Sequence, residues 1–466
     1  MAETLMSKKL WEPILDQGIP NTHFFNGRIL AAGDLKTEQE ANRRQHQQLG
    51  QAIGAGVVRG LEVSLVSDGS DGKAPVVAVT QGLALDCTGQ AIALPFDVQV
   101  ALEKENQTVP VEAGLFKTCT PPKKGTSPID AGVYLLVTSP ASGFRERAPM
   151  TGVGSGGKVV GCGARYAVEG VQFRLEELKV SSLTGLSQST RDAVAQLMTQ
   201  KDQASLSKLR NWLAHVCLGT EEVAGFLRDP FTRISGQRLN TSPFISYGAL
   251  DAMSGSGSLA CCDVPLALLY WPKGGVQFVD MWSVRRRPFS RPRSSVWPLP
   301  LSERRQAEAE AGFHQFENQA EELLRSKLSD SDLSAVKATD YFRYLPAAGI
   351  LPLAGKKGSR GVNLMNFTSG LTIRDRVALQ ALPIPDRVFI EAAKLEALMR
   401  DSLVYPPIDL NSGEMIWFHL VRENIQAIDK AAFKQPQPYL VFANGQIPCM
   451  GDARFDLNYW DYSNYA

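Results

Sequence analysis

The fold is decided by three strings, FFNGRILAAGDL (residues 24–35), GAGVVRGLEV (54–63) and VVAVTQGLALD (76–86). Apolar and polar residues alternate through the last string, and the alternation resumes between Ile92 and Val100. This period of two predicts strands, and one apolar face per strand predicts antiparallel neighbours over a core. Residues 57–65 are expected to form one strand, in which Gly60 indicates a bulge or a close backbone approach.

A polar helix is predicted before these strands. Asn26-Gly27 is typical of a turn, and Asp34 can cap a helix over residues 35–53. The helix contains few apolar residues, and Arg43 and Arg44 lie in its polar middle. Such a helix is either solvated, or it buries its amides and guanidinium groups against a partner. Arg43 and Arg44 are therefore candidate partner-binding residues.

Six strings carry a resemblance to a known family: FFNGRILAAGDLKTEQE, GAGVVRGLEV, GLALDCTGQAIALP, VPLALLYW, GGVQFVDMWSVRRR and YFRYLPAAGILP. They resemble proteins encoded beside contractile injection systems, which are phage-tail-like particles with a sheath, a tube and a baseplate. The resemblance implies a structural component at the baseplate or on the periphery of the particle. It implies other subunits of the particle and copies of the chain itself as partners, and it carries over no catalytic residue.

Length and composition favour a globular protein of several domains. A chain of 466 residues is too long for one ordinary core, and 44% hydrophobic with 21% charged residues is typical of a folded protein in water. The net charge of +1 creates no overall field toward nucleic acid or an anionic membrane. The N-terminus lacks the pattern of a signal peptide, and no apolar run reaches the ~18 residues of a membrane span.

The cysteines suggest a reducing compartment. The chain has seven, without regular spacing, at positions 87, 119, 162, 217, 261, 262 and 449. An odd number of irregularly spaced cysteines predicts reduced thiols and a cytoplasmic location. The adjacent Cys261 and Cys262 could form a redox pair, although a structural role is the commoner one.

The expected fold class is α+β: an antiparallel β-rich N-terminal domain with a helical insertion, followed by a mixed α/β C-terminal region. The predicted units are an arm and polar helix (1–54), a β domain (55–180), a helical insertion with a loop (181–260), and a C-terminal domain with an aromatic tail (286–466). A hairpin over 264–285 is expected to complete the sheet that begins near Val57. The other main expectations are strands at 133–137, 168–178, 414–422 and 439–443, the last opening a hairpin at Asn444-Gly445, loops at 139–163 and 236–257, and helices at 190–198, 205–217, 302–328 and within 384–403.

An arginine-rich strip follows the predicted hairpin. It contains Arg285, Arg286, Arg287, Arg291 and Arg293, and its prolines predict an extended segment. Three roles are open: a solvated linker, a contact with an acidic protein face, or a contact with nucleic acid or lipid. No nucleic-acid partner is expected of a near-neutral domain, whereas membrane contact through the strip stays open.

An aromatic tail ends the sequence, and it includes Tyr459, Trp460 and Tyr462. So many aromatic residues seldom stay exposed to water. The tail is expected either to fold back onto its own domain or to dock on another subunit.

The patterns that usually mark catalysis are weak in this sequence. Residues 152–158 match the spacing G-x-x-x-x-G-K, but Val159 stands where a phosphate loop needs serine or threonine, so a flexible loop is expected. The five histidines are scattered, and His419 lies in an apolar strand typical of a core. We therefore predict no catalytic, metal or cofactor site, no small-molecule substrate, and a structural role in a particle. A receptor- or carbohydrate-binding module and a loaded effector enzyme are the alternatives.

Overall fold

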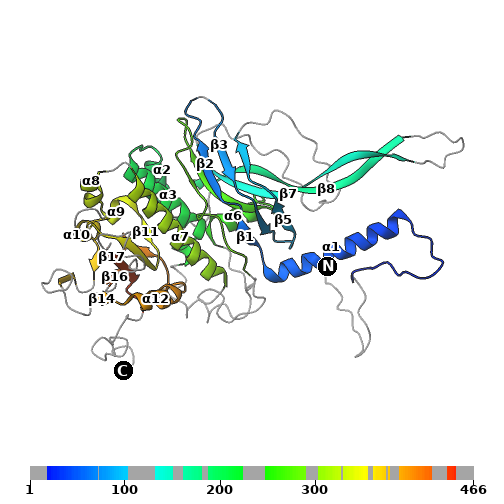
Figure 1. The fold of residues 1–466 in the computed structure, drawn as a ribbon. Coiled ribbons are helices and arrows are strands. Elements are labelled where there is room, and N and C mark those ends of the chain that lie inside the picture. Colours follow the sequence, from blue (N-terminus) through cyan, green and yellow to red (C-terminus); the bar gives the residue numbers. More distant parts are fainter. Residues whose placement is uncertain are drawn as a thin grey trace, which may run out of the picture.

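The computed structural model has an α+β fold that is organised around one buried antiparallel sheet (Figure 1). It describes residues 18–71, 73–102, 132–150, 161–180, 187–223, 247–289, 303–326, 329–354, 360–373, 376–377, 388–421 and 438–447.

The central sheet has the strand order β10–β9–β7–β8. Its strands are β7 (Gly132–Met150), β8 (Gly161–Glu177), β9 (Val264–Trp271) and β10 (Phe278–Asp280). Val133 and Leu135 of β7 enter one hydrophobic core, whereas Leu136 enters another on the opposite face. Because both faces are covered, VPLALLYW and GVYLLV are continuous apolar runs without alternation. The predicted hairpin forms, but β9 pairs with β7 and not with the strands near Val57.

Two small antiparallel sheets pack over one face of the central sheet. One consists of β1 (Gly56–Gly60), β4 (Gly82–Leu85) and β5 (Ala91–Leu94). The other consists of β2 (Val63–Ser67), β3 (Val76–Val79) and β6 (Val98–Ala101). The alternation therefore predicted strands correctly.

The single strand predicted over 57–65 is wrong, because the chain changes sheets at Gly60 and Leu61. These residues have φ angles of 58° and 55°, and the Leu61 side chain is fully buried. The close approach expected at Gly60 is confirmed, since a Cβ there would lie 1.8 Å from the Gln81 carbonyl oxygen. A left-handed pair of residues thus divides one apolar run between two sheets.

Three helices cover the other face of the central sheet: α2 (Gln188–Leu197), α3 (Gln203–Leu218) and α6 (Gly248–Ser256). Ser187 and Asp202 accept hydrogen bonds from the first turns of α2 and α3, as N-cap residues do. The helical insertion is confirmed in these positions. The loop predicted over 236–257 is wrong where α6 lies.

The C-terminal part packs a long helix against a second sheet. α7 (Glu303–Arg325) places Phe316 beside Phe342 and Phe442 in the core. The sheet has the order β12–β17–β16–β13, and β14 also pairs with β16. The remaining elements are α8 (Asp330–Ala335), α9 (Ala338–Tyr341), β11 (Tyr344–Leu345), β12 (Ala348–Pro352), α10 (Leu364–Phe367), β13 (Thr372–Ile373), β14 (Phe389–Ile390), η3 (Ala392–Lys394), α12 (Leu395–Ser402), β15 (Ile408–Asp409), β16 (Met415–Val421) and β17 (Tyr439–Asn444).

Two sequence-based predictions in this part need correction. The helix expected within 384–403 is present only as η3 and α12, because residues 389–390 form strand β14. β17 was expected to pair with the residues after Asn444-Gly445, but it pairs with β12 and β16. The chain beyond 447 lies outside the described residues.

A buried polar junction joins the N-terminal part of the described chain, up to residue 289, to the C-terminal part, from residue 303 onward. We define it as Arg210, Asn211, Asp280, Gln315 and Gln319. Arg210 Nε donates to Asp280 Oδ2 at 2.7 Å, and Gln315 Nε2 donates to the same oxygen at 3.1 Å. The Asn211 side-chain oxygen accepts the backbone N–H of Arg343 and Tyr344, each at 2.9 Å. The halves are therefore held by directional hydrogen bonds as well as by apolar packing.

Candidate functional site

Two projections leave the body on the same side, and they form the candidate partner-binding site (Figure 1). The first, which we call the arm, comprises residues 18–53 and is built on α1 (Ala32–Ile53). Its 22 helical residues span ~33 Å. The second, which we call the ribbon, comprises residues 139–150 of β7 paired with 161–172 of β8.

The ribbon is an extension of the central sheet. β7 pairs with β9 only between Gly132 and Thr138, so beyond Thr138 its partner among the described strands is β8 alone. The loop predicted over 139–163 is therefore wrong for residues 139–150 and 161–163, which are strand. Pro140, Gly143 and the run of small residues concealed these strands, because they break the alternation on which the prediction depended.

Residues 18–31 run back along α1 and cover its side. Thr22 Oγ1 donates to the Asp34 carbonyl oxygen at 2.7 Å, and Arg28 forms an ion pair with the Asp34 carboxylate. Asp34 was expected to cap the helix, but the helix begins three residues earlier than expected and its N-cap is Ala31. Asp34 lies in the first turn, where its Oδ2 accepts the backbone N–H of Ala31 at 2.9 Å. This hydrogen bond is the main cause that lowers the pKa of Asp34. Ala41 of α1 is buried.

The arm is anchored where α1 ends. A Cβ on Gly50 would lie 2.1 Å from the Gly89 carbonyl oxygen, so only glycine permits this approach of helix and turn. Gln51 Nε2 donates to the Thr88 carbonyl oxygen at 3.0 Å. We call the receiving turn, residues 86–90, the anchor turn.

Asp86 holds the anchor turn in shape. Its Oδ1 accepts the backbone N–H groups of Thr88 and Gln90, each at 2.8 Å, and the Thr88 hydroxyl at 2.6 Å. The side chain is buried, and burial raises the pKa of Asp86 against the effect of these hydrogen bonds. The anchor turn is thus fixed from within by one carboxylate.

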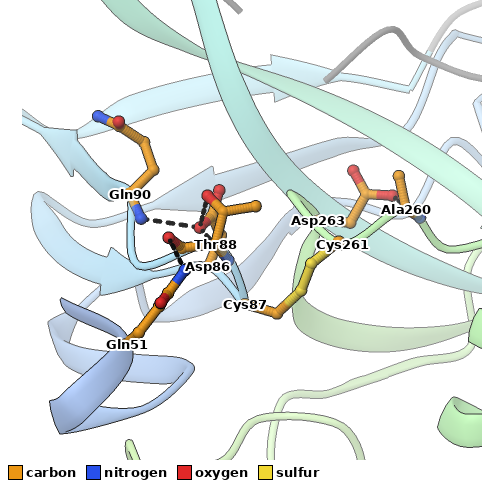
Figure 2. Close-up of a disulfide and its surroundings, with 8 residues drawn as sticks. All are labelled: Gln51, Asp86, Cys87, Thr88, Gln90, Ala260, Cys261 and Asp263. Atoms are coloured by element: carbon orange, nitrogen blue, oxygen red, sulfur yellow. Dashed lines mark hydrogen bonds between the residues drawn. A yellow bond between two sulfur atoms is a disulfide. The ribbon is translucent and has the colours of Figure 1, made fainter. Parts of the chain in front are cut away.

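A disulfide ties the anchor turn to the body. Figure 2 shows Cys87 bonded to Cys261, whose Cα atoms are 5.3 Å apart, with Gln51 of α1 beside the turn. Next to Cys261, Asp263 pairs with Arg174 of β8 and accepts the Ser139 hydroxyl at 2.6 Å. Arm and ribbon are therefore rooted in the same few residues.

This disulfide corrects the prediction of reduced thiols. It joins residues 174 positions apart, a distance that no spacing rule could suggest. Cys262 is buried and takes no part in a disulfide, so the less favoured alternative of a Cys261–Cys262 redox pair does not hold. Cys217 is likewise outside any disulfide, and burial raises the pKa of its thiol to about 12.

Exposed apolar side chains gather on the arm and the ribbon. Most of the large apolar side chains exposed in the described residues lie on these projections: Phe24, Phe25, Ile29, Leu30, Leu35, Leu49, Ile53, Phe144, Tyr166 and Val168. Ile29 is 91% exposed and Phe25 60% exposed. Single exposed apolar residues need no explanation, but a concentration on two projections is typical of a protein contact.

Arg43 and Arg44 differ in their surroundings. Arg43 forms an ion pair of 2.7 Å with Glu169 of β8, and this pair links the arm to the ribbon. Arg44 is exposed on the helix. Of the two candidate partner-binding residues, Arg44 is accessible, whereas Arg43 bridges the two projections of its own chain.

The described part of the arginine strip, residues 285–287, is not a solvated linker. Arg285 and Arg286 are buried, with 8% and 9% of their surface exposed. Arg285 donates to the carbonyl oxygens of Leu61 and Gly60 at 3.1 and 2.7 Å. Its guanidinium therefore stabilises the left-handed turn between β1 and β2, and a partner or a membrane cannot reach it.

Arg286 also has a structural role. It donates to the carbonyl oxygens of Trp282, Ser283 and Arg285 at 2.8 to 3.1 Å. Arg287 is the exposed member and pairs with Glu310 of α7 at 2.7 Å. The burial of Arg285 and Arg286 was missed because the pattern records charge alone, whereas an arginine can also donate to backbone carbonyl groups inside the fold.

The other candidate residues lie outside the described residues: Arg291, Arg293, Tyr459, Trp460, Tyr462 and the glycine-rich string 152–158. His419 lies buried on β16 beside Trp417, as a core histidine was expected to, and burial lowers its pKa.

A cavity lies beside His215 on α3, and it was not predicted. Trp212, Glu221 and Tyr344 are among its lining residues, and its volume is ≈ 10 Å³. That volume holds about one water, which is too little for an organic substrate. His215 Nδ1 lies 2.7 Å from Thr220 Oγ1.

Acid is expected to destabilise the fold through His215. Burial, with Arg305, Arg343 and Arg286 nearby, lowers its pKa to about 3, against ~6.5 in the unfolded chain. Below pH ~6.5 the unfolded chain therefore binds a proton that the folded chain does not. Stability falls as the pH drops toward 3, by up to about 1.4 kcal/mol per pH unit. In urea titrations across this range, His215→Gln should flatten the pH dependence, while His46→Gln on the exposed arm should leave it unchanged.

The comparison with known proteins is brief: no family model and no curated protein matches this chain. Within the described residues, no three or more His, Cys, Asp or Glu side chains are grouped to hold a metal ion. A search of the same residues finds no helix long and apolar enough to span a membrane.

Proposed function

We propose that this chain is a structural subunit of a contractile injection particle, at the baseplate or on the periphery. The observation that carries the proposal is the gathering of exposed apolar side chains on the arm and the ribbon, two projections that share one rigid root. Six strings of the sequence resemble proteins encoded beside such particles, and this resemblance is our reason for proposing a contractile injection particle. Its partners are other subunits and further copies of the chain, and its action is to hold them in place.

The disulfide bears on where the subunit works. Disulfides persist in oxidising surroundings and are rare in the cytosol. We propose that the chain is assembled into the particle in the cytoplasm, and that the Cys87–Cys261 bond matters once the particle is released. This keeps the predicted cytoplasmic assembly, with later release or membrane attachment as open alternatives, and corrects only the expectation that all thiols are reduced.

The test replaces Phe24, Phe25 and Ile29 of the arm together by serine. Because these side chains are exposed, the thermal unfolding midpoint should stay close to that of the wild type. Incorporation into purified particles, seen by electron microscopy and quantitative blotting, should fall at least about tenfold if each apolar contact contributes ~1 kcal/mol.

The matched control replaces Phe96 and Val377, which are 64% and 81% exposed on the body, by serine. Incorporation of this control should equal that of the wild type. Equal incorporation of all three proteins would contradict a partner-binding role of the arm. Binding of a glycan to the isolated chain, at a concentration that leaves incorporation into particles unchanged, would favour a carbohydrate-binding module instead.

A further inference from the structure

The outer part of β8 has an open edge within the described residues. β8 is the last strand in the order β10–β9–β7–β8, and one of its edges faces β7. β7 lacks a backbone donor at Pro140 and another at Pro149, whereas β8 contains no proline. A strand edge without proline presents N–H and C=O groups to any strand that approaches it. Of the two edges of the ribbon, that of β8 is the better suited to pair.

A third strand would also stabilise the ribbon. A two-stranded hairpin is only marginally stable in water, and three strands or a packed helix are needed for independent stability. Residues 165–170 of β8 are exposed, and Phe144 opposite them on β7 is 53% exposed. The ion pair of Arg43 with Glu169 joins this region to α1. One ion pair between partly exposed groups contributes little stability.

The sequence of the open edge is complementary to itself. Residues 165–169 read RYAVE. If two copies of β8 run antiparallel about a two-fold axis at Ala167, Arg165 lies opposite Glu169 of the second copy, and Tyr166 lies opposite Val168. Oppositely charged pairs and aromatic–β-branched pairs are the cross-strand pairs that stabilise a sheet. No other register of the two strands places Arg165 opposite Glu169 and Tyr166 opposite Val168 at the same time.

We propose that two copies of this chain associate through the outer edge of β8, antiparallel and centred on Ala167. The interface is isologous, so each favourable pair occurs twice. Glu169 can serve both partners, because Arg43 donates to Oε1 and leaves Oε2 for Arg165 of the second copy. Arg165 gives up its pair with Glu146, whose side chain is 59% exposed, and its cation–π contact with the neighbouring Tyr166 ring. The proposal deepens the proposed function, on which it rests for the presence of several copies.

A charge-swap experiment tests the register. Arg165→Glu makes the edge doubly acidic, and Glu169→Arg makes it doubly basic, so either variant alone places like charges opposite each other twice. In sedimentation velocity of the full chain, each variant should dimerise about 10- to 100-fold more weakly than the wild type. The two variants mixed should form a heterodimer of about wild-type affinity, and so should the double variant with itself.

The matched control is Arg145→Glu. Arg145 is exposed and lies opposite Tyr166 on β7, so it makes the same change of charge away from the open edge. Its dimerisation should stay within about twofold of the wild type. Wild-type protein that is monomeric at all concentrations, or single variants that dimerise as well as the wild type, would overturn the proposal.

A cross-link provides a second measurement that does not depend on charge. Residues opposite each other in an antiparallel pair have Cα atoms ~4.5 to 5.5 Å apart, which suits a disulfide. Ala167→Cys should therefore form a covalent dimer on mild oxidation, whereas Arg145→Cys should not. Failure of the cross-link together with normal incorporation into particles would reject the β8 interface and leave the proposed function intact. A dimer that forms in solution from a chain that never enters particles would reject the proposed function alone.

Discussion

Asp280→Asn is expected to lower the free energy of unfolding by about 3 kcal/mol. Asp280 is 1% exposed, and its carboxylate pairs with the buried guanidinium of Arg210 at 2.7 Å. Without that charge, Arg210 keeps the neutral Asn318 and, as a carboxylate partner, Glu322, whose side chain is 61% exposed. A buried cation that loses its buried partner costs far more than the pair itself contributed. Urea titration followed by tryptophan fluorescence measures the loss, since Trp212 and Trp282 lie close by.

The control for this experiment is Glu310→Gln. Glu310 pairs with Arg287 at 2.7 Å, the same distance as the buried pair, but both side chains are about two-fifths exposed, at 41% and 42%. An exposed pair contributes ~0 to 1 kcal/mol. The two variants therefore remove equal charge from pairs of equal length. They differ in burial and in the hydrogen bonds that Asp280 also accepts from Gln315 and from the backbone of Ser283. Similar losses in both would mean that burial of the polar junction is unimportant for stability.

Removing the Cys87–Cys261 disulfide by Cys87→Ala is expected to cost about 2 to 5 kcal/mol. The bond closes a loop of 174 residues, and the entropy that a cross-link removes from the unfolded chain grows with the size of the loop. In addition, the anchor turn loses its covalent connection to Asp263 and the root of the ribbon. Hydrogen exchange should therefore speed up most in residues 86–90 and in the last turns of α1.

The control is Cys262→Ala, which removes the buried neighbouring thiol and keeps the bond. It should show normal exchange in the anchor turn, and dithiothreitol should destabilise it as much as the wild type. Dithiothreitol should have little effect on the stability of Cys87→Ala. If the exchange of residues 86–90 is the same with and without the disulfide, the arm does not depend on this anchor.

The strands were predictable where one physical rule acted alone. Alternation found β3, β4, β5 and β6, and in β3, β5 and β6 burial alternates from one residue to the next. It failed at Leu61, where a left-handed residue moves the chain from one sheet to another and the apolar pattern continues without a break. It failed again along residues 139–150 and 161–167 of the ribbon, since a strand that is exposed on both faces has no pattern to detect. The strand predicted over 168–178 is confirmed as part of β8.

The candidate site could be predicted only in part. The polar helix pointed to a projection, and its sparse apolar residues are indeed exposed on α1. The arginine strip was misleading, because Arg285 and Arg286 bind carbonyl groups that only the folded chain brings to them. A turn at Gly89-Gln90 is predictable from the sequence and is present, but its role as an anchor is not predictable, because its disulfide partner and the Gly50–Gly89 contact depend on segments that are distant in sequence. A local sequence pattern indicates the conformation that a residue prefers. The disulfide and the Gly50–Gly89 contact depend instead on which distant segments the whole fold brings together.

Strand β7 is part of two different regions of the molecule. Its first half is buried between two cores at the centre of the molecule, and its second half is the ribbon. A pull on the tip of the ribbon would therefore travel along one continuous backbone into the core, and would meet the ladder to β9 lengthwise. When a strand is pulled along its own axis, the hydrogen bonds of its ladder are loaded in shear and must break together. The ribbon should therefore resist tension more strongly than a surface loop, whose bonds could break one at a time.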